Sequence, residues 1–301
     1  MKFEKELDYA QMMSALNDLI KEDSCPKMSY IGNSILHRPI PIITLGEQSA
    51  KKSVLYVATH HATENICTLV LLKFLNEFIA LNRQRRTACG INLDYMLKAR
   101  KIYIVPMLNP DGVDYRLHGI DAQNPLYDRV MRYSGGDFSK WNSNARGVDL
   151  NHNYDAGFYE YKIIEKEQKI TQGATKYSGE APESEPEVSA LASFIRYNAD
   201  ELCGVLTLHS QGEEIYYKSQ DKCPKKSEFV AKQVAKMTSY KLSKASGTAS
   251  YGGLTDWLIR KYDIPSFTLE CGLGENPLPP YLSADIYIRL RELLFTFPIL
   301  F

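Results

Sequence analysis

Short, largely apolar runs alternate with longer stretches of helical periodicity along this chain. Buried strands are expected at residues 39–45, 54–58, 102–105, 205–208 and 267–269. Directly after the second run, apolar residues recur at helical spacing from 66 to 78, which predicts a strand, a tight turn and a helix. Alternating buried strands and helices are typical of a largely parallel sheet covered on both faces. The pattern predicts an α/β protein with its site at the carboxyl ends of the strands.

The remaining segments give weaker signals. The first 30 or so residues predict a charged, amphipathic helix that leads into the core. Ser184-Glu185-Pro186-Glu187 is a capping-box pattern with proline in the first turn, which predicts that a helix begins there. Residues 116–146 lack periodicity and predict a long surface excursion. No repeat or linker divides the 301 residues, so we expect one domain over 1–301, with 1–30 as its helical lead-in.

Charge and composition exclude several classes of partner. Basic and acidic residues both total 36, so no single-sign field would attract nucleic acid or an anionic membrane. The first residues lack the apolar core of a signal peptide, and no stretch is as long as a membrane span, which favours a cytoplasmic protein. The six cysteines show no CxxC spacing, and we expect them to be reduced and not metal ligands.

Polar residues able to do chemistry follow several of the predicted strands. His61 follows the strand at 54–58, His209 follows 205–208, and Glu270 follows 267–269. Glu64 lies three residues after His61 at the strand-to-helix junction, so both side chains can point to one spot. Two histidines and a carboxylate would give zinc three ligands and leave its fourth position for water, as in hydrolytic sites. Alternatives remain open: a solvated helix end, a hydrogen-bonded strand-end histidine and, for Glu270, an ordinary buried ion pair.

Five ordered motifs resemble those of the zinc carboxypeptidase family. They are His61-Ala62-Thr63-Glu64, Asn109-Pro110-Asp111-Gly112, Gly147-Val148-Asp149-Leu150-Asn151, His209-Ser210-Gln211-Gly212 and Thr268-Leu269-Glu270. The resemblance implies a three-layer α/β/α sandwich around a mixed, largely parallel sheet, with one Zn²⁺ per chain. It implies that the zinc ligands are His61, Glu64 and His209, and that Glu270 is the general base. It also places Asp149 behind the first zinc histidine, where a carboxylate fixes the tautomer; a turn or cap residue is the alternative.

Within that family, three segments look most like bacterial γ-D-glutamyl-meso-diaminopimelate peptidases, which cleave cell-wall peptides. The segments are 141–151, 209–217 and 270–279. In this interpretation Arg146 is the candidate that stabilises the oxyanion of the tetrahedral intermediate, because a fixed guanidinium can face the developing charge. A surface arginine in a long loop is the alternative interpretation of Arg146.

The substrate-binding positions depart from the family. Ordinary carboxypeptidases follow the asparagine that corresponds to Asn151 with an arginine that grips the terminal carboxylate, and here that position is His152. A largely neutral histidine cannot form the bidentate fork, unless another arginine takes over. Tyr251 is the candidate that caps the substrate, although it falls three positions late. Thr255 stands where the family selects side chains, and its small hydroxyl is compatible with a polar group such as diaminopimelate.

These features predict a zinc peptidase that acts on small γ-D-glutamyl-diaminopimelate peptides, with water activated by the metal and Glu270. Two alternatives keep the same zinc site: a general metallocarboxypeptidase and an N-acyl amino acid amidohydrolase. A third alternative is an inactive binding module that kept the fold.

Overall fold

The protein is built around a mixed, eight-stranded sheet. The computed structural model describes residues 4–21, 25–244 and 251–301. Across the sheet the strand order is β1-β2-β6-β3-β7-β10-β8-β9. The strands are β1 (Lys27–Asn33), β2 (Pro39–Leu45), β3 (Lys52–Ala58), β6 (Arg100–Val105), β7 (Leu202–His209), β8 (Glu214–Tyr216), β9 (Lys241–Ser243) and β10 (Ser266–Glu270). A separate two-stranded sheet joins β4 (Thr87–Ala88) to β5 (Ile91–Asn92).

Four parallel strands form the centre of the large sheet. β6 and β7 flank β3, and β10 follows β7, all in the same direction. Antiparallel strands close both sides, with β2 against β6 and β8 against β10. Because β7 and β10 are parallel and in register, His209 and Glu270 lie directly opposite each other at the carboxyl ends of their strands. This confirms the predicted α/β fold with a largely parallel sheet.

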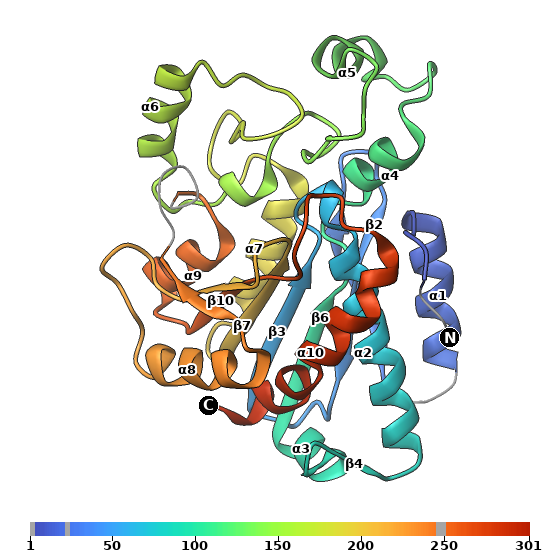
Figure 1. Ribbon diagram of the computed structural model, residues 1–301, viewed down its shortest axis with the longest axis vertical. Coiled ribbons are helices and arrows are strands. Elements are labelled where there is room, and N and C mark those ends of the chain that lie inside the picture. The colour runs from blue at the N-terminus through green and yellow to red at the C-terminus, as the bar shows by residue number, and fades with distance from the viewer. Residues whose placement is uncertain (1–3, 22–24, 245–250) are drawn as a thin grey trace.

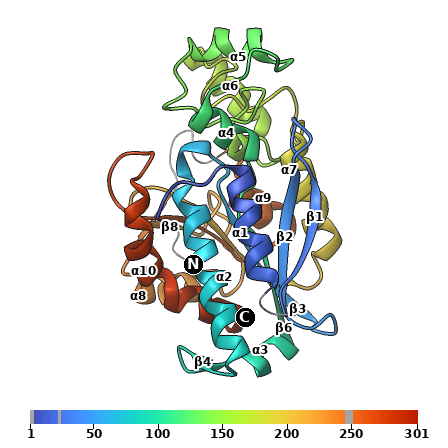
Figure 2. The same cartoon turned by 90° about the vertical axis from the view of Figure 1, so that its right-hand side faces the viewer.

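Helices cover both faces of the sheet (Figures 1 and 2). The described helices are α1 (Tyr9–Lys21), α2 (Ile66–Arg83), α3 (Leu93–Ala99), α4 (Pro110–His118), α5 (Tyr127–Ser134), α6 (Phe158–Gln168), α7 (Pro186–Asn198), α8 (Ser227–Thr238), α9 (Leu254–Tyr262) and α10 (Ser283–Thr296). Alternate residues of β3 enter opposite cores: Tyr56 packs with the α2 and α10 side, and Leu55 with the α7 and α9 side. In the part of the chain that the structure describes, no helix has the length and apolarity to cross a membrane.

Three details differ from the sequence expectations. The amino-terminal helix is limited to Tyr9–Lys21, and the polar strand Lys27–Asn33 follows it. Helix α7 begins as expected, but Ser184 does not cap it: Glu185 is the N-cap residue, and the Ser184 hydroxyl donates to the Glu185 carboxylate. The excursion at 116–146 contains the helix Tyr127–Ser134.

Asn109 joins the excursion to the end of β3. Its side-chain oxygen accepts from Gly112 N at the start of α4, and its amide donates to the backbone oxygens of His60, Asn142 and Ser143. An asparagine side chain offers two donors and an acceptor, and Asn109 uses them to hold two separate loops. In Figure 1 these loops lie at the upper end of the central strands, below α5 and α6.

Candidate metal centre and substrate cavity

The three predicted metal ligands meet at the carboxyl ends of β3 and β7. His61 precedes a single 3₁₀ turn (Ala62–Glu64) between β3 and α2, Glu64 is the last residue of that turn, and His209 ends β7. Glu64 lies between the histidines: His61 Nδ1 is 2.9 Å from its Oε1, and His209 Nδ1 is 2.9 Å from its Oε2. One donor atom from each residue lies within 4.8 Å of the other two. This spacing fits one metal ion held by two imidazoles and a carboxylate.

The hydrogen bond from His61 Nε2 to Asp149 is compatible with a cation bound at the other ring nitrogen, Nδ1. His61 Nε2 donates to Asp149 Oδ1 across 3.1 Å. With that proton placed, the neutral ring presents a lone pair at Nδ1 toward Glu64, which also offers only lone pairs. Two acceptors at this distance need a proton or a metal ion between them. The donor set therefore fits zinc, the metal of the predicted site.

Charges around the centre stabilise one another. Burial alone lowers the pKa of His61, but the Glu64 and Asp149 carboxylates outweigh burial and hold it well above its usual value. Burial has the opposite effect on the two acids, yet the neighbouring histidines hold the pKa of Glu64 and of Asp149 below the usual range. Both carboxylates are therefore ionised at neutral pH and available to a cation.

Glu270 faces this centre from the end of β10. It lines the same cavity as the three candidate ligands and lies opposite His209 in the strand register. Burial raises the pKa of Glu270 to about 7; the His209 ring opposes that effect, and the Glu64 carboxylate adds to it. A carboxylate that titrates near neutrality can both take and return a proton, as a general base and acid must.

A cavity of about 270 Å³ opens beside the candidate metal centre. Its volume is near the lower end of small-molecule sites, which suits a short peptide side chain. Besides the residues named above, its lining comprises Asn142, Asn151, His152, Thr175, Lys176, Tyr216, Lys218, Gly253, Thr255, Asp256 and Thr268. The predicted substrate residues Asn151, His152 and Thr255 are thus brought together with the predicted metal ligands and Glu270.

His152 is fixed as a hydrogen-bond acceptor toward the cavity. Its Nδ1 donates to the backbone oxygen of Tyr251 across 2.7 Å, and its ring stacks on Tyr161 with centroids 4.1 Å apart. Burial lowers the pKa of His152, with Asp149 opposing, so the ring is neutral at pH 7. A neutral ring that donates from Nδ1 has only the Nε2 lone pair left. It therefore offers no cation to a substrate carboxylate.

The structure does not bring Arg146 to this cavity. Its guanidinium donates twice to Glu185 Oε2, at 3.1 Å and 3.0 Å, and once to the backbone oxygen of Ser184. Arg146 lines a different cavity, of about 180 Å³. The Asn144 side chain accepts from the backbone N of Arg146 and of Val148, and the chain turns here so that the guanidinium reaches a buried carboxylate instead. The expected oxyanion role of Arg146 therefore has no geometric basis.

Tyr251 also lies outside the cavity lining. Its backbone holds His152, and its ring lies 6.5 Å from that of Tyr161. The residues directly before it, 245–250, are outside the described part of the chain. The expectation that Tyr251 caps the substrate stays a prediction.

Asn142 is a site residue that the sequence reasoning missed. Its Oδ1 accepts from the backbone N of Thr63, at 3.2 Å, and from the Thr63 hydroxyl. This fixes the amide orientation and leaves the side-chain N–H groups for the cavity that Asn142 lines. The available signal was its place beside the buried Trp141, in a segment that already carried the family resemblance.

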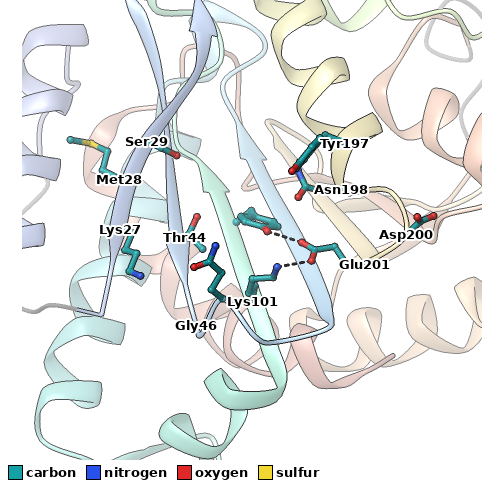
Figure 3. A pocket seen from close by; sticks show the side chains of 12 residues that line it. Lys27, Met28, Ser29, Thr44, Gly46, Lys101, Tyr197, Asn198, Asp200 and Glu201 are labelled. Atoms are coloured by element: carbon teal, nitrogen blue, oxygen red, sulfur yellow. Dashed lines mark hydrogen bonds and ion pairs between the residues drawn. The ribbon is translucent and has the colours of Figure 1, made fainter.

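A larger cavity, of about 780 Å³, lies at the opposite end of the central strands, away from this chemistry. Lys101 and Tyr103 of β6 both reach Glu201, at 2.5 Å and 2.6 Å (Figure 3). These polar groups satisfy one another. None of the predicted site residues lines this cavity.

Comparison with known proteins gives consistent relatives. A family model described as zinc carboxypeptidase matches residues 12–286. The chain is 32% identical over 278 residues to γ-D-glutamyl-L-diamino acid endopeptidase 1 from Lysinibacillus sphaericus, a match that covers 92% of this chain and 68% of that protein. It is 28% identical over 281 residues to carboxypeptidase B2 from Homo sapiens, covering 86% and 60%.

Solved structures agree on the fold. The crystal structure of thrombin activatable fibrinolysis inhibitor superposes with a TM-score of 0.71 at 20% identity, covering 98% of this chain and 75% of that one. Murein-tripeptide amidase from Escherichia coli O157 superposes with a TM-score of 0.56 at 19% identity, covering 90% and 92%.

Proposed function

The chain belongs to the zinc carboxypeptidase family and is a zinc metallopeptidase, and from this premise we propose that it hydrolyses the bond between γ-D-glutamate and a diamino acid in cell-wall-derived peptides. One Zn²⁺ is held by His61, Glu64 and His209. The observation that carries the proposal is the meeting of these three residues with Glu270 in one cavity. We also keep the expectation of a cytoplasmic location as part of the proposal.

The chemistry that zinc supplies at such a site is Lewis acidity toward the scissile carbonyl and toward an attacking water. Glu270 takes the proton from that water and returns it to the leaving amine nitrogen. Asn142 supports the reaction by donating its free side-chain N–H to the developing oxyanion. Asp149 keeps the His61 ring oriented throughout.

The state of His152 supports this substrate over an ordinary C-terminal residue. A carboxypeptidase needs a cation that pairs with the terminal carboxylate, and a buried, neutral His152 offers only an acceptor. An acceptor suits an amide or ammonium N–H of a longer substrate. The similarity to an enzyme named for γ-D-glutamyl-L-diamino acid bonds points the same way.

Lys176 favours a second candidate, a general metallocarboxypeptidase. It lines the cavity from a loop whose backbone N donates to Asp149, and it forms no ion pair within residues 4–21, 25–244 and 251–301. Its ammonium could therefore replace the missing arginine. Release of ordinary C-terminal residues, lost in Lys176→Met, would establish this second function over the first.

The test of the proposed function compares three proteins on γ-D-glutamyl-meso-diaminopimelate and γ-D-glutamyl-L-lysine peptides. Wild type should cleave the γ-D-glutamyl bond, identified by mass spectrometry, and a chelator should stop it. Glu270→Gln should lose at least about 10³-fold in kcat while it keeps one zinc per chain. Glu275→Gln, an exposed neighbour, is the matched control and should behave as wild type. Retained turnover in Glu270→Gln, or loss of zinc from it, would contradict the assigned roles.

A further inference from the structure

The 3₁₀ turn Ala62–Glu64, named the metal turn from here on, is too short to fix its own position. It is closed by the backbone hydrogen bond from Glu64 N to His61 O. An isolated turn of this kind holds its shape weakly, so the position of Glu64 depends on contacts from other segments. One such contact comes from Asn142, which accepts from the backbone N of Thr63. Further contacts come from α4 and from the segment before α1.

Arg116 joins the metal turn to the amino-terminal segment. It lies in the last turn of α4, and its side chain is only 6% exposed. Its Nε donates to the backbone oxygen of Ala62 across 3.1 Å, and its Nη2 donates to the Glu6 carboxylate. The N–H groups of a guanidinium form a rigid fork, so one arginine can hold both partners at once. The ion pair with Glu6 therefore fixes the group that holds Ala62.

Asn65 gives a second connection to the same segment. It directly follows Glu64, is fully buried and precedes α2. Its side-chain amide donates to the backbone oxygen of Leu7 across 2.7 Å, where the segment before α1 passes the start of α2 (Figure 2). The residues on both sides of Glu64 are thus tied to residues 6 and 7.

The amino-terminal segment has contacts of its own that dock it along α4. Asp8 Oδ2 lies 3.1 Å from His118 Nε2, and the backbone N of Tyr9 donates to Asp114 Oδ1 across 3.0 Å. Both partners belong to α4, the helix that carries Arg116. The segment is therefore held independently of the metal turn and can support it.

We propose that Glu6 and Arg116 are positioning residues for the metal centre: they hold Glu64 through Ala62, so that docking of residues 6–9 strengthens zinc binding. The inference concerns the metal and no particular substrate, so it goes beyond the proposed function. Loss of a residue that orients a metal ligand typically weakens metal binding by about 10–100-fold. Because coupling between two sites is reciprocal, bound zinc should stabilise the docked segment in turn.

A purely structural role for Arg116 makes a different prediction. Breaking a buried ion pair lowers the stability of the fold wherever the pair lies. The folded protein would then keep its affinity for zinc. Zinc affinity, measured on folded protein, therefore separates the two roles.

The first experiment measures the Kd for Zn²⁺ by competition with a chromophoric chelator. Arg116→Met should raise the Kd by about tenfold or more, because methionine cannot donate to Ala62. Arg116→Lys, which keeps the charge and one contact, should restore part of the affinity. Glu6→Met should also raise the Kd, and the double variant should be no worse than Arg116→Met, because Glu6 acts through Arg116. Circular dichroism checks that each protein is folded.

Two results would overturn the proposal: an unchanged Kd in Arg116→Met, and additive losses in the double variant. If Arg116→Met does not fold, Arg116→Lys and Glu6→Met make the same test with smaller changes, and a wild-type Kd in both would refute the role.

The matched control is Arg291→Met. Arg291 also pairs with a carboxylate, since its Nη2 lies 2.6 Å from Glu77 Oε1 where α10 packs on α2. This variant should lower the midpoint of thermal unfolding of the metal-free protein and keep the Kd for Zn²⁺. A raised Kd in Arg291→Met would show that any lost ion pair weakens zinc binding, and would refute a specific role for Arg116.

Hydrogen exchange tests the reciprocal effect and requires no hydrolysis. The Tyr9 amide reports docking of the segment, because it donates to Asp114. Zinc should slow its exchange by about tenfold or more in wild type and much less in Arg116→Met. The amides of β9, at the far edge of the sheet, should change little in either protein. No slowing at Tyr9, or equal slowing in both proteins, would overturn the coupling. Absence of γ-D-glutamyl peptide cleavage beside a zinc effect at Tyr9 would count against the proposed function alone.

Discussion

Hydrogen bonds hold the Asn142 and Arg146 side chains at different cavities, although the two residues are close in sequence. Thr63, beside the candidate ligand Glu64, donates to the Asn142 side-chain oxygen, and Asn142 lines the cavity with its N–H groups still available. Arg146 is held by Glu185, at the start of α7, where it lines another cavity. A guanidinium whose donors are satisfied by a buried carboxylate has little to gain from an oxyanion elsewhere. At this scale, the hydrogen bonds favour the Asn142 amide over Arg146 as the proposed oxyanion donor.

We expect Asn142→Asp to lower kcat by about 10²–10³-fold, the usual effect of losing an oxyanion donor. Aspartate keeps the oxygen that accepts from Thr63 but has no N–H for the substrate.

Arg146→Met should leave kcat within about threefold and lower the free energy of unfolding by about 1–2 kcal/mol, since Glu185 keeps its other hydrogen bonds. Steady-state kinetics and urea denaturation measure both effects. A large kcat loss in Arg146→Met with normal stability would reverse the two assignments.

The candidate metal histidines and the proposed base could be predicted from sequence because each is tied to a regular element. His209 and Glu270 each end a buried strand, His61 lies three residues after one, and parallel strands bring such ends together. The position of the Arg146 side chain could not be predicted this way, because Arg146 lies in a loop. There the direction of its side chain depends on a local turn that the Asn144 side chain stabilises. Asp256, which also lines the cavity, was missed because an acid in the first turn of a helix is usually explained by capping.

At the scale of elements, the amino-terminal end of α7 concentrates buried acids. Glu185 and Glu187 share the Asn144 amide, which lies 2.6 Å from the first carboxylate and 3.3 Å from the second. Glu187 is fully buried, and burial raises its pKa to about 8, with the Asp111 carboxylate adding to the effect. The helix start is therefore sensitive to ionisation of one side chain.

We expect stability to fall as pH rises from about 5 to 9, and Glu187→Gln to remove much of that fall. The folded pKa of Glu187, about 8, lies above its ordinary value, so the unfolded chain releases this proton first. The contribution is complete below the ordinary pKa and is lost as pH rises through 8. The stability difference between Glu187→Gln and wild type should grow by about 4 kcal/mol across this range. Urea denaturation at several pH values measures it, with the exposed Glu180→Gln as control; a constant difference would contradict the assignment.

Strands and helices whose apolar residues recur in a buried pattern could be predicted from the sequence. Strands made mostly of exposed polar residues could not. The strand Pro39–Leu45 and the four central strands have apolar runs that only burial explains. The strand Lys27–Asn33 was missed because most of its side chains are partly or fully exposed, so it shows no apolar run. Ser184 matches the capping pattern but bonds to Glu185, a tertiary choice that local sequence does not encode.

At the scale of the whole molecule, the candidate metal centre joins segments that are distant along the chain. His61 and Glu64 come from the β3–α2 junction, His209 from β7, and Asp149 from the long segment between α5 and α6. Without a metal ion, only a proton can lie between the acceptors His61 Nδ1 and Glu64 Oε1. A metal bound at this point stabilises the folded state alone, because the unfolded chain does not bring the ligands together.

Zinc should therefore raise the midpoint of thermal unfolding, and a chelator should lower it. Binding to the native state contributes RT ln(1 + [L]/Kd), which is about 2.7 kcal/mol when free zinc is a hundred times Kd. His209→Ala should lose this zinc response, while Glu270→Gln should keep it, because Glu270 is proposed to move protons and not to hold the metal. Scanning calorimetry with zinc and with chelator measures the shift in each protein. An equal shift in wild type and His209→Ala would place the metal elsewhere. Loss of the response in Glu270→Gln would instead make that residue a ligand and remove the proposed base.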